Sequence, residues 1–489
     1  MSGICGLFNL DGAPVAESDL ASMSAMLQRR GPERTGHWRG GDVGLGHTLL
    51  ATTPELEFEK QPFEHAETGC KITADVRLDN RDELAQALTL RKPLGEIGDA
   101  ELILSAYLKW GENCVDHLLG DFAFAIWDPR DKMLFCARDH CGMRPLYFHH
   151  SPGQRFVFAS DARAILVLPQ VPFAINEGRV ADYLVPQLEW YDYESTFYEG
   201  VFRLPPGHKL CVSSSDIRIA EYWRPTPGPD LRLKSDDEYR EAFLDVFTQA
   251  IEARLRAPDG TVGSMLSGGM DSGSVVAFGK EILRKRGDGP LPTFSGVRRT
   301  AASGPGDLDC AETRAVHAAI SMPSIASTLV HPDELDEFYE QLSCGFEEPF
   351  DGVFTILKAL FLSARRNGLR VLLDGGGGDI VLHEGSYIAR LIRGGHLIRA
   401  AIEIDSGCRY WEHRSMLRSI LRHSRAALVP EVLKKPLRPY LIRRRTAEWQ
   451  HESLIEPGFA ARVGIEERHK HMRTVFPIGW TPDYAVEYC

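Results

Sequence analysis

The residues best suited to chemistry form a run of small side chains closed by an acid, Met265-Leu266-Ser267-Gly268-Gly269-Met270-Asp271-Ser272. Small residues after a strand let backbone N–H groups approach phosphate oxygens, and the start of the next helix adds positive potential. Asp271 then stands where a carboxylate can hold Mg²⁺ against the β- and γ-phosphates. The run predicts an ATP site that releases pyrophosphate. Its candidate ATP-binding residues are Leu266, Ser267, Gly268, Gly269, Asp271 and Ser272.

The flanking sequence supplies the elements that must position this loop. Phe243, Phe247, Ile251 and Leu255 recur at helical spacing upstream, and a turn over residues 257–260 leads into a short strand over residues 261–266. Downstream, residues 274–278 read as the opening of a helix. The order strand, glycine loop and helix is the one that a phosphate site requires.

A second glycine loop follows the buried strand that ends at Leu373, with the order Asp374-Gly375-Gly376-Gly377-Gly378-Asp379. Ligands of open α/β sheets bind beyond the carboxyl ends of the strands, so we expect this loop to face the first one. Asp379 could then share Mg²⁺ with Asp271. Further candidate ATP-binding residues are Val297, Asp374, Gly375 and Gly376.

Length and composition limit the class of protein. A chain of 489 residues predicts two or three domains, and the formal net charge of −12 argues against a nucleic-acid-binding surface. No stretch approaches the roughly 20 apolar residues of a membrane span, and the first residues lack a signal pattern. The 10 cysteines include no Cys-x-x-Cys pair. Reduced thiols in a cytoplasmic protein are therefore expected, without zinc or a membrane partner.

A change in composition marks the boundary between two halves. Pro225, Pro227, Gly228 and Pro229 crowd into a few residues, which predicts a linker over residues 224–232. Residues 1–223 before it contain short apolar runs broken by turns, as in a strand-rich domain. In residues 233–489, helical patterns alternate with buried strands such as 291–297 and 369–373. That alternation predicts a parallel sheet with helices on both faces.

The chain resembles the asparagine synthetase superfamily over residues 1 to about 387. The resemblance implies an α+β glutaminase-type domain with the αββα sandwich of N-terminal-nucleophile enzymes. An α/β ATP-pyrophosphatase domain, of the adenine nucleotide alpha hydrolase-like type, would follow it. Members adenylate a carboxylate with Mg-ATP, release pyrophosphate and let an amine attack the acyl-AMP. Beyond the first glycine loop, the matching segments are Met1-Ser2-Gly3-Ile4-Cys5-Gly6, Arg30-Gly31-Pro32-Glu33, Gly120-Asp121-Phe122-Ala123-Phe124-Ala125, Ala137-Arg138-Asp139, Arg144-Pro145-Leu146-Tyr147, Phe158-Ala159-Ser160-Asp161 and Leu204-Pro205-Pro206-Gly207-His208.

The first domain departs from the glutaminase pattern. The resemblance places Ser2 in the slot of the nucleophilic cysteine, and a hydroxyl is a poor substitute for a thiolate at neutral pH. Asp75-Val76 aligns with the family's Asn-Gly oxyanion pair, and Leu49 aligns with its glutamine-holding arginine. Asp99 remains as a candidate ligand for the α-amino group of glutamine. We therefore expect that glutamine hydrolysis is lost.

The second glycine loop also departs from the family, which has Gly-Glu-Gly-Ser-Asp-Glu where this chain has Gly375 to Ile380. Both glutamates are replaced, by Gly376 and Ile380. Lasso-type peptide macrolactam synthetases show the same loss, and residues 78–84 resemble them too. That resemblance implies a precursor peptide as substrate, whose own amine attacks the activated carboxylate. It also implies a leader-peptide-binding protein or a protease as partner.

Three functions remain open at the level of sequence. A glutamine-independent macrolactam synthetase is favoured over a glutamine-hydrolysing asparagine synthetase, which would take aspartate and an amine donor. An inactive scaffold is the third, because only about 100 residues follow Tyr387 where the family has nearer 200, and truncation would explain this. His383 and Glu384 are candidate acid–base groups for amine attack. Candidates for the family's closing cation are Lys434, Lys435 and Lys470, and a basic stretch over residues 390–445 could attract an acidic peptide.

Overall fold

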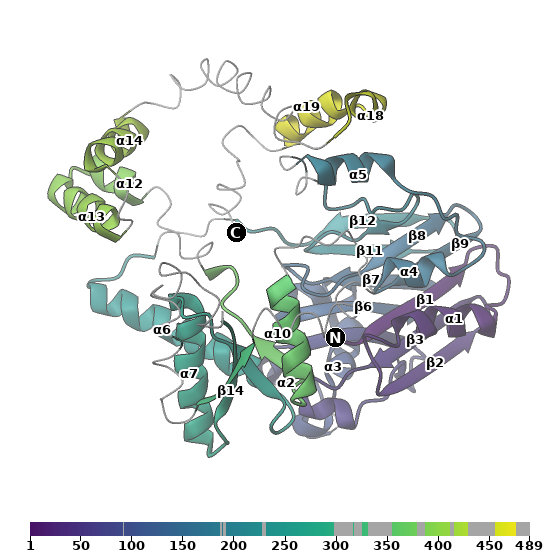
Figure 1. Cartoon of the computed structure of the whole chain (residues 1–489). Helices are drawn as coiled ribbons and strands as arrows, with labels where there is room; N and C mark the ends of the chain where they lie inside the picture. Colours follow the sequence, from purple (N-terminus) through teal and green to yellow (C-terminus); the bar gives the residue numbers. More distant parts are fainter. Residues whose placement is uncertain are drawn as a thin grey trace. The chain divides into compact units, whose positions relative to one another are not determined.

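The computed structural model describes residues 1–90, 92–185, 188, 192–226, 231–297, 316, 325–330, 355–378, 387–410, 415–428 and 455–475 (Figure 1). Contacts between residues divide the chain into two units. The first comprises residues 1–176, 193–224 and 228–376, and the second comprises residues 177–192, 225–227 and 377–489. The predicted linker divides the sequence at residues 224–232. In the structure, most of the half before it belongs to the same unit as the parallel sheet of the half after it.

Two antiparallel six-stranded sheets begin the first unit, with the strand orders β10-β8-β9-β1-β3-β2 and β12-β11-β7-β6-β5-β4. The strands of the first sheet are β1 (Gly3–Asn9), β2 (Arg34–Gly40), β3 (Val43–Leu49), β8 (Tyr147–Ser151), β9 (Arg155–Ala159) and β10 (Phe202–Arg203). Those of the second are β4 (Phe63–Glu64), β5 (Lys71–Leu78), β6 (Gly120–Asp128), β7 (Met133–Arg138), β11 (His208–Val212) and β12 (Ile217–Glu221). Short 3₁₀ turns lie at Pro54–Glu57, Leu94–Glu96 and Gly111–His117.

The two sheets form the middle layers of a sandwich, as strand β1 illustrates. All of its residues are buried, because alternate side chains enter different cores. Ile4 and Phe8 pack between the sheets, whereas Cys5 and Leu7 pack beneath helices α1 (Glu17–Leu27) and α4 (Ala162–Leu166). Helices α2 (Arg81–Ala87) and α3 (Asp99–Trp110) cover the outer face of the second sheet. The predicted αββα sandwich is confirmed.

The rest of the first unit is a parallel sheet. Its described strands are β13 (Val262–Met265), β14 (Leu291–Gly296), β15 (Ile325–Val330) and β16 (Val371–Leu373), in the order β15-β14-β13-β16. Helices α6 (Asp236–Arg254) and α7 (Met270–Arg286) pack on one face, and α10 (Thr355–Arg366) packs on the other. A parallel sheet with helices on both faces is what the sequence predicts.

The described part of the second unit consists of helices. Helix α5 (Glu177–Leu184) packs against α18 (Pro457–Arg462) and α19 (Ile465–Val475) around an apolar cluster. Arg468 on α19 donates to the buried carboxylate of Asp182 on α5, at 2.7 and 2.5 Å. A separate group contains α12 (Tyr387–Arg393), α13 (Leu397–Tyr410) and α14 (Met416–Leu428). Among the described helices, none has the length and apolar character needed to cross a membrane.

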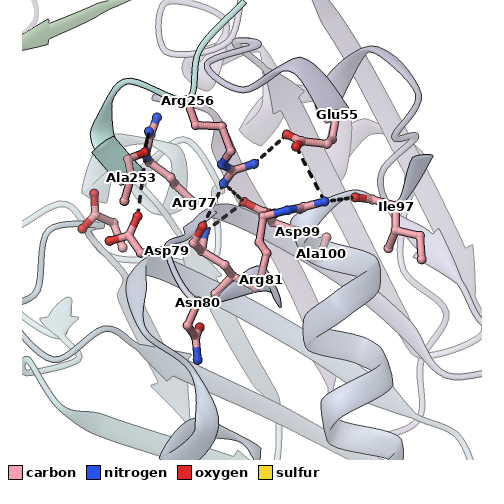
Figure 2. Close-up of polar contacts among 12 residues, drawn as sticks. Glu55, Arg77, Asp79, Asn80, Arg81, Ile97, Asp99, Ala100, Ala253 and Arg256 are labelled. Atoms are coloured by element: carbon pink, nitrogen blue, oxygen red, sulfur yellow. Dashed lines mark hydrogen bonds and ion pairs between the residues drawn. The ribbon is translucent and has the colours of Figure 1, made fainter. Parts of the chain in front are cut away.

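A cluster of buried charges joins the sandwich to the parallel sheet (Figure 2). Arg256 lies two residues beyond α6 and donates to Asp99 Oδ2 at 2.8 Å, to Leu78 O at 2.9 Å and to Glu55 Oε2 at 2.6 Å. Arg81 holds the other oxygen of Asp99. Arg254 donates to Asp121 and to Asp79, each at 2.9 Å. We call this set the junction cluster, and its members are Glu55, Arg77, Asp79, Arg81, Asp99, Asp121, Arg254 and Arg256.

The close packing of charges in the junction cluster shifts the pKa values of groups in it and beside it. Burial, together with the neighbouring Arg256 and Arg254, lowers the pKa of Arg77 to about 10. Glu59 lies beside the cluster, where it accepts hydrogen bonds from Ala100 N at 3.1 Å and from the Gln61 side chain at 2.5 Å. Burial and the charge of Asp99 raise the pKa of Glu59 to about 7. Ionised Glu59 therefore weakens the folded state.

Replacement of Glu59 by glutamine should stabilise the protein at high pH. The pKa of Glu59 is about 7 in the folded chain, against an ordinary value of 4.5. Ionisation of Glu59 therefore destabilises the fold progressively above about pH 4.5 and fully above about pH 7. At pH near 8 the variant should gain on the order of 2 kcal/mol, seen as a rise of a few degrees in Tm. At pH near 4.5 thermal melts of variant and parent should coincide.

The matched control is Glu57→Gln, because Glu57 is an exposed carboxylate two residues away. It should leave Tm unchanged at both pH values. Equal stabilisation by Glu59→Gln at both pH values would show that shape, rather than charge, decides the effect.

Candidate active site

The first glycine loop, residues 266–269, leaves β13 at its carboxyl end and enters α7. Leu266 N donates to Phe294 O at 2.9 Å on the neighbouring strand, and the Ser295 hydroxyl donates to Leu266 O at 2.6 Å. These bonds fix the backbone at the carboxyl end of β13. Gly268 has φ +85°, a left-handed conformation that favours glycine. The tight turn thus depends on glycine at this position.

Two serines close the turn from within. Ser267 N donates to Ser272 Oγ at 3.1 Å, and the two hydroxyls lie 2.9 Å apart. Helix α7 begins at Met270, immediately after Gly269, and so four residues before the helix opening predicted at residue 274. The amide groups of its first turn, which have no partner inside the helix, therefore point toward the loop. This earlier start strengthens the positive potential at the site.

Asp271 lies in that first turn. Its side chain is half-buried, and within the described part of the chain its carboxylate has no hydrogen-bond or ion-pair partner. A half-buried carboxylate without an internal partner is free to take an external one, such as a cation. No group of three or more His, Cys, Asp or Glu side chains with metal-site geometry occurs among the described residues. Of the two predicted metal ligands, Asp271 is the one that lies among the described residues, and its carboxylate oxygens suit Mg²⁺.

The second glycine loop lies against the first. Strands β13 and β16 are parallel neighbours with Val262 opposite Val371, so both loops leave the same edge of the sheet. A Cβ added to Gly375 would lie 2.5 Å from Ser272 N and 2.9 Å from Asp271 Cβ. Within this loop, Gly376 N donates to Asp374 Oδ1 at 2.8 Å. The two glycine-rich segments thus form one backbone-lined site.

The remaining residues predicted for this half are only partly placed. Val297 follows β14, is buried, and donates its N–H to Val330 O at 3.0 Å. Asp379, His383 and Glu384 lie outside the described residues, and so do Lys434 and Lys435. Lys470 is exposed on α19.

The slot predicted for a nucleophile in the sandwich holds Ser2, which is buried. Its hydroxyl accepts a hydrogen bond from Leu50 N at 3.1 Å, and Arg30 Nε donates to its carbonyl oxygen at 3.2 Å. Nearby, the carboxylate of Asp75 lies 3.8 Å from Arg30 and 3.8 Å from Arg144. Ser2 is thus bonded to Leu50 and Arg30, beside the carboxylate of Asp75.

Asp99, predicted as a glutamine-pocket remnant, belongs to the junction cluster. Its side chain is 1 % exposed, and both of its oxygens accept from arginines while Leu78 N adds a third bond at 2.9 Å. Leu49, which stands where the family has an arginine, is a buried side chain. An ammonium group would have to displace Arg81 or Arg256 to reach Asp99.

Sequence reasoning missed Arg254 and Arg256 at this site. They lie 175 and 157 residues from Asp79 and Asp99, so neither spacing nor periodicity links them. One signal was available, because two arginines flank the apolar Leu255 at the end of a helix. Both arginines are half-buried, and arginines rarely leave solvent unless they are paired.

Comparison with known proteins gives two matching families. Residues 1–223 match the glutamine amidotransferase domain family, and residues 242–472 match the asparagine synthase family. Asparagine synthetase (glutamine-hydrolysing) 3 of Bacillus subtilis is 31% identical over 301 residues, which cover 60% of this chain and 48% of that protein. Asparagine synthetase (glutamine-hydrolysing) 1 of the same organism is 27% identical over 385 residues, covering 78% of this chain and 58% of that protein.

Among solved structures, the glutamine phosphoribosylpyrophosphate amidotransferase of Bacillus subtilis with ADP and GMP is 16% identical. It covers 64% of this chain and 70% of that chain, with a TM-score of 0.33. The chain spans about half the length of the Bacillus synthetases that it matches. With a glutamine amidotransferase domain followed by an asparagine synthase domain, the chain belongs to the asparagine synthetase superfamily.

Proposed function

We propose that this protein is an ATP-dependent ligase that activates a side-chain carboxylate of a peptide and closes a macrolactam without using glutamine. The observation that carries the proposal is the state of Asp99. Its carboxylate is saturated by Arg81, Arg256 and Leu78 N, in a domain that otherwise keeps its complete sandwich fold. A ligase whose peptide substrate supplies the amine has no need of a glutamine-binding carboxylate, and such an enzyme can keep the sandwich for its structure alone.

The reaction has two steps. The peptide carboxylate attacks the α-phosphorus of ATP, the bond to the β-phosphate oxygen breaks, and pyrophosphate leaves. The amine at the start of the peptide then attacks the acyl carbon, AMP leaves and one proton is lost. Since the leaving groups are good, the protein has mainly to position the partners and neutralise phosphate charge.

The residues of the two glycine loops have distinct roles in this proposal. Backbone N–H groups of the first loop and of the first turn of α7 bind phosphate oxygens. Asp271 and Asp379 would hold Mg²⁺, which would supply positive charge beside the phosphates. His383 or Glu384 removes the proton from the attacking amine. The close approach of Gly375 to Ser272 N supports the first of these roles, because any side chain there would fill the space.

The absence of glutamine chemistry has three supports. Ser2 replaces a thiol nucleophile, Asp75 places negative charge 3.8 Å from Arg30 near it, and Asp99 is consumed in the junction cluster. An oxyanion formed beside Asp75 would be repelled rather than stabilised. The seven described cysteines are free thiols, which favours a cytoplasmic location. A leader-peptide-binding protein or protease would act with the enzyme on the precursor peptide.

A second candidate is glutamine-dependent asparagine synthesis. The names of the Bacillus relatives favour it, and its substrates would be aspartate and an amine donor. The third candidate, an inactive scaffold, has no structural observation in its favour beyond those already given for the lost glutaminase.

Substitution of Gly375 tests the nucleotide site. Gly375→Ala should lower peptide-dependent ATP–pyrophosphate exchange by about a hundredfold, because the new Cβ would collide with Ser272 N and Asp271. The control is Gly289→Ala, which lies just before β14 and outside both glycine loops, and where an added Cβ meets no atom within 4 Å. The control should retain exchange. Full activity of Gly375→Ala would mean that ATP binds elsewhere.

Glutamine hydrolysis tests the state of the sandwich. Purified protein incubated with glutamine should release glutamate at the rate of the buffer alone, because Ser2 is a hydroxyl and Asp99 is occupied. An enzyme-linked glutamate assay measures this. Glutamate release that Ser2→Ala abolishes would instead establish a working serine glutaminase.

The class of substrate is tested by exchange with different carboxylates. Gly376 and Ile380 leave no carboxylate for the ammonium group of free aspartate, and an unpaired ammonium costs about 1–3 kcal/mol to desolvate. A peptide with an acidic residue several positions from its amine should therefore stimulate ATP–pyrophosphate exchange, whereas free aspartate should not. Asp271→Ala should abolish the peptide-dependent signal. Exchange with aspartate alone, or asparagine formed from aspartate and ammonia, would favour the second candidate.

A further inference from the structure

Two cavities lie within the first unit where the sandwich meets β16, and both have Arg370 in their walls. Arg370 lies directly before the first residue of β16, whereas the second glycine loop follows the last one. The cavities are therefore at the opposite end of this strand from the nucleotide site. We call the pair the junction groove. Arg29, Arg30 and Arg365 line the first cavity, and Leu56, Glu57 and Phe58 line the second.

The first cavity, of about 390 Å³, has a strongly cationic wall. Arg370 donates to Ala51 O at 2.9 Å and pairs with Glu33 at 3.1 Å, and Arg30 lies 3.8 Å from Asp75. By contrast, Arg29 and Arg365 have no hydrogen-bond or ion-pair partner in the described part of the chain. Of the four guanidinium groups, two are thus paired, Arg370 with Glu33 and Arg30 with Asp75. The formal net charge of the whole protein is −12. The excess of positive charge in this wall favours an anion.

Much of the rest of the first cavity's lining is apolar, whereas the second cavity also has Glu33, Arg34, Glu57 and Asp259 in its walls. Leu50, Phe361 and Leu372 contribute to the first cavity, and Phe361 is 47% exposed. The second cavity, of about 620 Å³, continues with Leu49, Leu56 and Phe58, and Phe58 is 63% exposed. Volumes of this size are typical of ligand sites. Apolar walls beside unpaired guanidinium groups fit a carboxylate that carries apolar neighbours better than they fit an inorganic anion.

We propose that the junction groove is a docking site for an acidic peptide segment. The carboxylate of the segment lies between Arg29 and Arg365, which pair with it through planar N–H donors. Its apolar neighbours cover Leu50 and Phe361, and the chain continues past Arg370 toward Leu56 and Phe58. The proposal rests on the proposed function in one respect, namely that the peptide is the substrate. It assigns the sandwich a role in holding that peptide away from the nucleotide.

Charge reversal of the unpaired arginines tests the groove directly. The probe is a short fluorescein-labelled peptide with a single glutamate among glycine, alanine and leucine residues, and its binding is followed by fluorescence anisotropy without ATP. The double variant Arg29→Glu/Arg365→Glu should weaken binding roughly tenfold or more, since it replaces two attractive charges by two repulsive ones. The same peptide with glutamine in place of glutamate should bind the parent protein as weakly.

The matched control is Arg240→Glu/Arg284→Glu. These exposed arginines lie on α6 and α7, where each pairs with an acid three residues away. The control changes the net charge by the same amount as the test variant and should leave peptide affinity unchanged. Equal loss in both double variants would reduce the effect to overall charge and overturn the groove. Equal binding of the glutamate and glutamine peptides would overturn it as well.

Exchange measurements separate the groove from the proposed ligase activity, and they use a longer peptide that carries a reactive acidic residue near its amine and a second glutamate in a separate segment for the groove. With both ideas correct, Arg29→Glu/Arg365→Glu should raise the peptide concentration for half-maximal ATP–pyrophosphate exchange and leave the maximal rate unchanged. Peptide binding that depends on Arg29 and Arg365, without any exchange, would support the groove and contradict the ligase. Peptide-stimulated exchange that is indifferent to the variant would support the ligase and contradict the groove.

Discussion

The pairing of Asp99 with Arg81 and Arg256 is the interaction on which the first unit depends. A buried carboxylate is tolerated only where its oxygens are hydrogen-bonded and its charge is balanced. Here one arginine comes from the sandwich and the other from the end of α6. The charge of Asp99 thereby fixes the beginning of the parallel sheet relative to the sandwich, within a single unit.

That anchoring has a consequence for the chemistry. Only a short turn separates Arg256 from β13, and β13 ends at the first glycine loop. The start of the strand is held by charges and its end by the bond from Ser295 to Leu266 O. Such fixed ends would favour the proposed binding of phosphate oxygens by this loop, because preorganised N–H groups need no reorientation as charge develops.

The pairing of Asp99 with two arginines also gives the sandwich a structural role. Central strands such as β1 are buried on both faces, so the stability of the fold does not depend on a catalytic use of its pocket. Arginines rather than a substrate ammonium satisfy Asp99, and Asp75 lies between Arg30 and Arg144. The sandwich thus serves as a wall and an anchor for the parallel sheet, and its charged groups are arranged to match.

The sequence by itself determined the local elements and the two glycine loops. Short apolar runs broken by turns and glycines after buried strands are local signals, because they depend on neighbours along the chain. The tertiary structure alone decided the pairing of Arg256 with Asp99 and the contact between Gly375 and Ser272. Each joins residues more than a hundred positions apart, and no pattern of spacing encodes which buried charge finds which partner. Packing of the whole unit sets those pairs, since a buried charge must take the partner that the fold brings within reach.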